Sequence, residues 1–214
     1  MANKYREIWN KLHKEFSAKH EVKYDDWLVE FDDIIESTKL PIIDLGCGST
    51  ANNTHYLLEK GKRVISCDFS QEALSVVKKI DGSETKLFDM LDEFPFEENS
   101  TDIVIADLSL HYFKEKETFE ILNKINKILT NRGYLFFRLN STNSTEFKNL
   151  MKDNVKEIEH HLYHTNNMEK RFFDKEDIEK FFDNWNFVIK PIEENMTRWT
   201  SDKIVWKGVV QVNK

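Results

Sequence analysis

A glycine-rich segment is the first place where residue types and spacing suggest chemistry. The residues DLGCGST start at Asp44 and follow a short apolar run. Glycine at positions 46 and 48 lets the backbone turn sharply and lets a ligand approach where a Cβ would block it. Gly46, Gly48 and Ala51 also satisfy the G-x-G-x-x-G/A fingerprint of dinucleotide-binding proteins. The segment therefore predicts a nucleotide-like ligand, and NAD is one candidate.

The carboxylate of Asp44 separates two classes of ligand. A pyrophosphate placed over this turn would meet a like charge two residues before the first glycine, which disfavours binding. S-adenosylmethionine carries an ammonium and a sulfonium group, and an acidic side chain attracts both. The residues therefore favour S-adenosyl-L-methionine, with S-adenosyl-L-homocysteine as the product, over NAD. The alternative role for Asp44 is to cap the turn through backbone hydrogen bonds.

Two further acidic residues follow apparent strands. Asp68 ends the segment RVISCD, about 20 residues after the glycine turn, where a carboxylate can accept hydrogen bonds from ribose hydroxyls. Phe69 beside it is placed to pack on an adenine ring. Asp89 is a candidate acceptor for the adenine amino group, and Met90 is a candidate to cover the ring with its polarisable thioether. The alternative roles are a solvated turn for Asp68, a loop acid for Asp89 and a core position for Met90.

These residues need strands that end at one edge of a sheet, and the order of apolar segments predicts that arrangement. Short apolar segments alternate with segments of helical spacing. Strands are expected at 41–45, 63–67, 85–88, 102–106 and 134–139, and helices at 54–60, 70–80 and 115–129. Because such alternation is typical of βαβ units, we expect a Rossmann-like, doubly wound α/β sheet that is mostly parallel and covered by helices on both faces.

The two ends of the chain depart from this alternation. Apolar stripes of helical spacing at 4–20 and 27–35 predict two helices before the first strand. The segments 157–165 and 168–173 flank Asn166-Asn167, which predicts an inserted β-hairpin. The chain is then expected to close with a helix at 175–183 and a pair of antiparallel strands at 187–193 and 204–212.

Composition and charge restrict the function classes. The 214 residues carry a formal net charge of −7, and the basic residues form no cluster. Nucleic-acid binders generally present a basic face, so the charge argues against a nucleic-acid partner.

The sequence has no run of about 18 apolar residues, its start is charged throughout, and two cysteines are too few for a disulfide framework. We therefore expect a cytoplasmic protein without membrane contact, as a monomer or homodimer.

Taken together, these segments resemble the class I S-adenosylmethionine-dependent methyltransferases. The matching segments are DLGCGS, CDFS, FDM, DIVIADLSLHYF and ILTNRGYLFFRLNS, and they cover about 41–140. The resemblance implies a seven-stranded sheet with one antiparallel strand. The ending of the chain is similar to the tellurite-resistance branch and to other small-molecule methyltransferases, which implies a small-molecule acceptor. The expected organisation is one domain over 1–214, with a helical lid at 1–38, a cofactor-binding core at 39–140, a substrate-side insertion at 141–174 and a closing helix and strand pair at 175–214.

The resemblance implies roles for particular residues in cofactor binding. The glycine turn would hold the methionine end of the cofactor, the acid of CDFS the ribose and the acid of FDM the adenine. The residues expected at the cofactor are Asp44, Gly46, Cys47, Gly48, Thr50, Asn53, Asp68, Phe69, Asp89, Met90, Asp107 and Leu108. One departure from the family pattern is Thr50, which stands where a third glycine is frequent. Thr50, Asn52 and Asn53 are therefore candidates to donate hydrogen bonds to the methionine carboxylate.

Methyl transfer from a sulfonium is an in-line displacement, so positioning and exclusion of water can supply much of the acceleration. A base helps when the acceptor carries a proton. His111, in the segment DLSLHY, is the first candidate for that base, with Tyr112 beside it. The alternative role for His111 is packing against the cofactor.

Several side chains are candidates to bind the acceptor. Arg138, Asn140 and Arg171 could hold an anionic group, and Trp9 could line an aromatic acceptor site. Arg138 lies within an expected strand, and its alternative role is to pair with a surface carboxylate. For Trp9 the alternative role is core packing.

A group of three histidines raises the question of a metal site. On the expected hairpin, His160 and His164 share a face while His161 points away, and no cysteine is near. We therefore expect no metal site and assign these side chains to solvent or to the rim of the substrate site.

Other functions stay open at this point. The second enzymatic reading is an NAD-dependent oxidoreductase, which Asp44 and the lack of an evident hydride-transfer group oppose. A third is a non-catalytic cofactor-binding or partner subunit with the methyltransferase fold. Methylation of protein or nucleic acid also stays open, because the family includes both.

Overall fold

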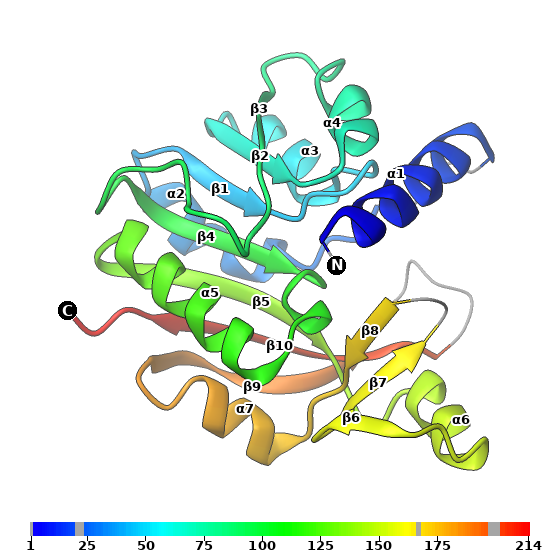
Figure 1. Ribbon diagram of the computed structural model, residues 1–214. Helices are drawn as coiled ribbons and strands as arrows, with labels where there is room; N and C mark the ends of the chain where they lie inside the picture. The colour runs from blue at the N-terminus through cyan, green and yellow to red at the C-terminus, as the bar shows by residue number, and fades with distance from the viewer. Residues whose placement is uncertain (1, 20–23, 166–167, 197–201) are drawn as a thin grey trace.

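The computed structural model describes residues 2–19, 24–165, 168–196 and 202–214. Its centre is a seven-stranded sheet in the order β3-β2-β1-β4-β5-β10-β9 (Figure 1). The strands are β1 (Ile42–Leu45), β2 (Val64–Asp68), β3 (Glu84–Leu87), β4 (Thr101–Asp107), β5 (Leu129–Asn140), β9 (Asn186–Asn195) and β10 (Ile204–Gln211). Strands β1 to β5 pair in parallel, and β10 is antiparallel to both of its neighbours. The prediction of a mostly parallel Rossmann-like sheet with one antiparallel strand is confirmed.

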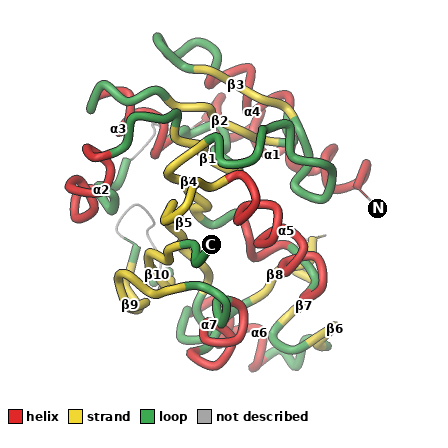
Figure 2. The backbone as a smooth tube through the Cα atoms, turned by 90° about the vertical axis from the view of Figure 1, so that its left-hand side faces the viewer, coloured by secondary structure: helices red, strands yellow, loops and turns green. Residues whose placement is uncertain are grey.

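Helices cover both faces of this sheet, as Figure 2 shows in a view roughly along the strands. The helices are α1 (Ala2–Lys19), η1 (Val29–Phe31), α2 (Asp32–Ser37), α3 (Asn52–Glu59), α4 (Gln71–Val77), η2 (Leu110–Tyr112), α5 (Glu115–Ile128), α6 (Thr145–Lys152) and α7 (Lys175–Phe181). The buried side chains of η1, α2 and α3 pack on one face, and those of α5 and α7 on the other. None of the helices within the described ranges combines the length and apolar content that crossing a bilayer requires.

The sequences of the central strands are apolar at successive positions because adjacent residues pack against opposite faces of the sheet. Phe136 lies against Phe31 of η1, with ring centroids 5.2 Å apart. The next residue, Phe137, points to the opposite face and stacks on Phe182 with a centroid distance of 4.3 Å. Successive side chains of a strand face opposite sides, so a sheet covered on both faces requires apolar residues at every position.

The strand order reverses between β1 and β4, which lie side by side although β2 and β3 intervene in sequence. In open α/β sheets, ligands bind beyond the carboxyl ends of the strands at such a reversal. The segments that follow β1 and β4 are DLGCGST and DLSLHY. The fold therefore places the two segments with the strongest chemical signals at one point.

A second, three-stranded antiparallel sheet follows β5. It consists of β6 (Glu157–Glu159), β7 (Leu162–Thr165) and β8 (Met168–Arg171). The predicted hairpin between 157–165 and 168–173 is present as β7 and β8, with Asn166 and Asn167 outside the described residues. The prediction of one continuous strand over 157–165 is wrong, because the chain turns at His160 and His161 and so forms a second hairpin.

Two helices differ from expectation. The predicted helix at 27–35 is a short 3-10 turn followed by α2, although its predicted apolar residues Trp27, Leu28, Phe31 and Ile35 are buried. Helix α6 occupies 145–152, where the sequence pattern predicts no element. Ser144 caps it by accepting a hydrogen bond from the Phe147 backbone N–H at 3.3 Å.

Candidate active site

The turn after β1 requires glycine at its first predicted position. Gly46 has a φ of +74°, and a Cβ placed on it would lie 2.5 Å from the Cβ of Ser109, which follows β4. Gly48 also has a positive φ, and its hypothetical Cβ would lie 3.4 Å from the imidazole of His13. Ala51 adopts a left-handed φ of 49° immediately before α3. The turn is thus held between the segment after β4 and helix α1.

Asp44 is buried beneath this turn and is bonded by side chains. Its carboxylate accepts hydrogen bonds from Asn53 Nδ2 at 3.0 Å and Thr54 Oγ1 at 3.1 Å. Asn53 Oδ1 in turn accepts from Trp27 Nε1 at 2.9 Å. The alternative role of a turn cap through backbone hydrogen bonds is therefore not the arrangement seen. The pKa of Asp44 is raised to about 7, chiefly by burial and in smaller part by the neighbouring carboxylates of Asp107 and Asp68. The hydrogen bonds from Asn53 and Thr54 oppose this rise.

A pKa near 7 for Asp44 predicts that S-adenosylmethionine binding depends on pH. The ammonium and sulfonium of this cofactor favour the carboxylate form, so binding should release a proton below pH 7. We expect the Kd to rise by up to about tenfold for each unit below pH 7, measured by titration calorimetry between pH 5.5 and 7.5. The same raised pKa makes the free protein less stable as the pH rises. The stabilisation that comes from the protonated Asp44 side chain is fully present below the pKa of Asp44 in the unfolded chain, and it is lost as the pH rises through about 7.

The matched variant for this prediction is Asp44→Asn, which keeps the size of the side chain. It should bind S-adenosylmethionine more weakly and with a Kd that no longer follows this titration. An equal Kd at pH 5.5 and 7.5 in the unmodified protein would exclude Asp44 as a group whose ionisation controls binding.

Asp68, at the end of β2, joins the glycine turn to α4. Its two carboxylate oxygens accept from the backbone N–H of Gly48 at 2.9 Å and of Ser70 at 2.8 Å. Burial raises the pKa of Asp68, and the nearby imidazole of His13 opposes that shift. Asp44 and Asp68 therefore end adjacent strands on either side of the turn, where the sequence places them.

Helix α1 contributes two residues that sequence reasoning does not assign to the site. Nδ1 of His13 lies 3.1 Å from Ser49 Oγ, and Asn10 Oδ1 accepts from Ser70 Oγ at 2.7 Å. Both polar residues are on the side of α1 that carries Trp9, and Trp9 stacks on His13 with a centroid distance of 5.3 Å. Asn10 and His13 are polar, three positions apart and next to an apolar stripe, and this spacing could have predicted that both face the site. The role of 1–38 as a lid stays a prediction.

The residues predicted around the adenine lie near the turn. Asp89 is buried, and its Oδ1 accepts from the Leu91 backbone N–H at 3.0 Å. The methyl group of Met90 lies 3.4 Å from the hypothetical Cβ of Gly46. Lys124 holds this loop by donating to the carbonyls of residues 90, 91 and 92. The predicted cofactor contacts of Cys47, Thr50, Phe69, Asp89, Met90 and Leu108 stay predictions.

Arg138 is buried and joined to two carboxylates. Its Nε and Nη2 donate to Asp107 at 2.8 and 2.7 Å, and its Nη1 and Nη2 donate to Asp25 at 3.1 and 3.3 Å. The guanidinium also lies over the ring of Trp27, 4.5 Å from the ring centroid. Four hydrogen bonds to carboxylates give Arg138 and Asp107 a structural role, and the geometry does not favour acceptor binding by Arg138 or cofactor binding by Asp107.

Arg171 is likewise engaged within the protein. Its Nη2 donates to Glu159 at 2.8 Å, its Nη1 donates to the His160 carbonyl, and its guanidinium lies over the ring of Phe181. Nε of Arg171 is buried and has no hydrogen-bond partner among the described residues, and the role of Arg171 in acceptor binding stays a prediction.

His111 is one of several buried polar side chains with an atom that has no hydrogen-bond partner among the described residues, and both of its ring nitrogens are in that state. Its side chain is 1% exposed, and neither ring nitrogen has a hydrogen-bond partner among the described residues. Burial holds the pKa of His111 well below its usual range, and Lys203 and Lys170 act in the same direction. Tyr112 lies beside it with a centroid distance of 4.2 Å, and Trp9 contacts Tyr112 edge-on. The lowered pKa favours the neutral form of the His111 imidazole at neutral pH.

Two further polar groups without partners follow the ends of adjacent strands. Oγ of Ser109 and Nδ2 of Asn140 are buried and make no hydrogen bond among the described residues. Buried polar atoms without partners are costly, so such an atom near the carboxyl end of a strand is a candidate to bond to a ligand. Of these residues, Ser109 lies against Gly46 of the turn that the sequence assigns to the cofactor.

Comparison with known proteins assigns a domain to part of the chain. Residues 43–137, somewhat under half of the chain, match the family model described as a methyltransferase domain. The tRNA N(3)-methylcytidine methyltransferase Mettl2 of Drosophila melanogaster is 33% identical over 110 residues, which cover 45% of this chain and 33% of that protein. The aligned part of the chain thus spans about a third of the length of this curated relative.

Solved structures show the same fold across most of the chain. A SAM-dependent methyltransferase from Methanosarcina mazei has a TM-score of 0.70 at 17% identity, covering 84% of this chain and 96% of that one. TehB from Haemophilus influenzae has a TM-score of 0.62 at 15% identity, with 87% and 61% covered. The 1,6-didemethyltoxoflavin-N1-methyltransferase of Burkholderia thailandensis, solved with S-adenosylhomocysteine, has a TM-score of 0.63 at 14% identity, with 86% and 76% covered. These structures show the fold. The match of residues 43–137 to the methyltransferase domain bears out the prediction of S-adenosylmethionine as the cofactor.

Proposed function

We propose that this protein transfers the methyl group of S-adenosylmethionine to a small-molecule acceptor that binds beside His111. The observation that carries this proposal is the buried imidazole of His111, whose two nitrogens have no partner among the described residues. His111 lies in the segment after β4, whose Ser109 meets the glycine turn at Gly46. A structural histidine at such depth would be expected to make hydrogen bonds within the protein.

The residues of the site fit the cofactor. Asp44 and Asp68 end neighbouring strands around the turn and supply negative charge for a cationic ligand. The missing Cβ atoms let the turn pack closely, at Gly46 against Ser109 of the segment after β4 and at Gly48 beside His13 of α1. When bound, S-adenosylmethionine supplies an electrophilic methyl group on sulfur and leaves as S-adenosylhomocysteine.

His111 would act on the acceptor. A neutral imidazole can accept a hydrogen bond from an acceptor O–H or N–H and take its proton as the acceptor's lone pair bonds to the methyl carbon. The electrons of the broken carbon–sulfur bond stay with the sulfur. Ser109 Oγ and Asn140 Nδ2 would orient the acceptor, and the aromatic side chains of Trp9 and Tyr112 would exclude water.

The electrostatics near His111 favour an acceptor of low or negative charge. Lys170 and Lys203 both act on the His111 imidazole, and Lys170 pairs with Glu146 at 2.6 Å.

A second candidate function is methylation of tRNA, because the relative with 33% identity is named for that reaction. The net charge of −7 opposes it, since an RNA polyanion would be repelled by most of the surface.

The first experiment is calorimetric titration with S-adenosylmethionine, S-adenosylhomocysteine and NAD. We expect micromolar binding of the two sulfur compounds and none of NAD. An acceptor screen with small thiols, amines and oxyanions would follow, with unmodified tRNA as a separate arm. Transfer of label to tRNA alone would refute the small-molecule acceptor, and failure of both sulfur compounds to bind would favour a non-catalytic partner subunit.

Replacement of His111 tests its role once an acceptor is known. His111→Ala should lower kcat by about 100-fold or more, in the range typical of loss of a general base. The Kd of S-adenosylmethionine should change little, because His111 is assigned to the acceptor. The control is His164→Ala, which alters an exposed histidine of β7. Equal kcat across pH for His111→Ala and the unmodified protein would exclude His111 as the base.

A further inference from the structure

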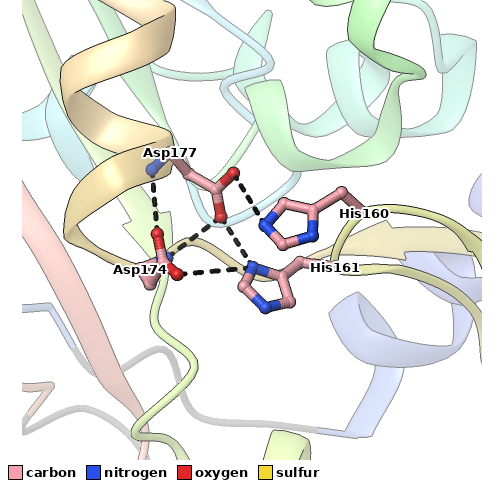
Figure 3. Close-up of side chains that lie close together, drawn as sticks. All are labelled: His160, His161, Asp174 and Asp177. Atoms are coloured by element: carbon pink, nitrogen blue, oxygen red, sulfur yellow. Dashed lines mark hydrogen bonds and ion pairs between the residues drawn. The ribbon is translucent and has the colours of Figure 1, made fainter.

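Four metal-ligating side chains converge outside the proposed active site, between the second sheet and the start of α7 (Figure 3). They are His160 and His161 from the turn between β6 and β7, and Asp174 and Asp177 from the beginning of α7. One ligand atom from each residue lies within 4.8 Å of the others. The expectation that His161 points away from His160 is wrong, because their rings lie 3.9 Å apart between centroids.

The turn itself directs both histidines toward α7. Because β6 ends at 159 and β7 begins at 162, the two histidines are the entire loop of a tight hairpin. His161 adopts a φ of 55°, which is uncommon for residues other than glycine. Glycine and asparagine are the usual residues of such loops. Two adjacent imidazoles in this loop therefore suggest a use for the side chains beyond forming the turn.

The distances are those of a loosely assembled coordination site. His161 Nδ1 lies 2.7 Å from Asp177 Oδ2 and 4.0 Å from Asp174 Oδ2, and His160 Nε2 lies 3.6 Å from Asp177 Oδ1. Ligand atoms around tetrahedral Zn²⁺, at bond lengths of about 2.0–2.2 Å, are about 3.4 Å apart. The observed separations of 2.7, 3.6 and 4.0 Å bracket this value, so modest side-chain rotations would bring the four atoms around one ion.

Charge and access also suit a divalent cation. Two imidazole nitrogens and two carboxylate oxygens provide four ligands, and the two aspartates together offset the charge of a dication. The Asp177 side chain is only 4% exposed, whereas His160 is 58% exposed, so the group is anchored at one end and open to solvent at the other. Imidazole ligands favour zinc and its transition-metal neighbours over Mg²⁺ and Ca²⁺, which prefer oxygen.

We propose that His160, His161, Asp174 and Asp177 form a structural Zn²⁺ site that joins the β6–β7 turn to the start of α7. The competing arrangement is a set of hydrogen bonds that cap the helix, in which Asp174 and Asp177 accept from each other's backbone N–H. Arg171 already joins the two parts, since it donates to the carbonyl of His160 and lies over Phe181 of α7. An ion here would add a second connection between the second sheet and the helix that packs on the main core. This site does not depend on the proposed methyl transfer.

The test uses the untagged full chain after treatment with a chelator, titrated with ZnCl₂ and separately with MgCl₂. We expect one Zn²⁺ per chain with a Kd in the micromolar range or tighter, no comparable Mg²⁺ binding, and a higher Tm with Zn²⁺. Binding of Co²⁺ in place of Zn²⁺ should give the visible absorption of a four-coordinate ion. No Zn²⁺ binding, or binding without an effect on Tm, would overturn the proposal.

Variants locate the ion. His160→Ala and His161→Asn should each weaken Zn²⁺ binding at least tenfold, and asparagine is chosen at 161 because it tolerates a positive φ and preserves the turn. His164→Ala removes a nearby exposed histidine and should leave the Kd unchanged. Circular dichroism without metal should show that all three variants fold. Equal weakening by His164→Ala, or unchanged binding in the two ligand variants, would assign the ion to another place.

Discussion

Arg138→Met should lower the free energy of unfolding by about 3–5 kcal/mol, the usual cost of removing one partner of a buried ion pair. Methionine keeps much of the side-chain length and its contact with Trp27, so the principal loss is the positive charge. The carboxylates of Asp25 and Asp107 would then be left without it, and their side chains are only 5% and 6% exposed. Chemical denaturation at pH 7.5 measures this change.

A matched control exists in Arg63, whose bond to Glu84 lies at the surface with 63% and 45% of the two side chains exposed. Arg63→Met should cost no more than about 1 kcal/mol, because exposed ion pairs contribute little. Adding Asp25→Asn and Asp107→Asn to Arg138→Met should recover part of the lost stability, since two buried negative charges that have lost the guanidinium are removed. A change in acceptor KM for Arg138→Met at nearly unchanged stability would instead support the acceptor-binding role that the sequence suggests for Arg138.

Gly46→Ala should abolish measurable S-adenosylmethionine binding, with a loss of more than about 100-fold in affinity, and lower the free energy of unfolding by about 2–4 kcal/mol. The added Cβ would lie 2.5 Å from the Cβ of Ser109, an atom close to the backbone that cannot swing aside. A φ of +74° adds strain for any residue with a Cβ. Either the turn or the segment after β4 must move, and both are assigned to the site.

Gly61→Ala separates the two causes. Gly61 has a similar φ of +69°, but no heavy atom lies within 4 Å of its hypothetical Cβ. It should therefore show only the cost of the left-handed backbone, about 1–2 kcal/mol, with cofactor affinity unchanged. Calorimetry and thermal unfolding of both variants make the comparison. Equal behaviour of the two variants would show that the close contact between Gly46 and Ser109 has no part in binding.

Local patterns determined the order of the elements and the position of the site along the chain. The apolar segments around Asp44 and Asp68 predict strands that place these residues at or near their carboxyl ends, because side-chain periodicity and glycine-containing turns act over a few residues. Once parallel pairing is inferred, both acids follow at the same sheet edge. The seven-stranded fold and the glycine turn were therefore predictable. Helix α6 and the break of the strand at His160 were missed although local contacts hold both, the cap from Ser144 and the bond from the His161 N–H to Glu157.

The sequence by itself therefore determined the type of fold and the class of cofactor, and tertiary structure decided which polar groups are already paired. Arg138 pairs with Asp25, 113 positions away, and His13 meets Ser49, 36 positions away. Residue type shows that an arginine can bind an anion, but only the folded chain shows that a buried carboxylate occupies it. The same reasoning selects His111, because an unpaired buried imidazole is a property of its surroundings, which no local pattern contains.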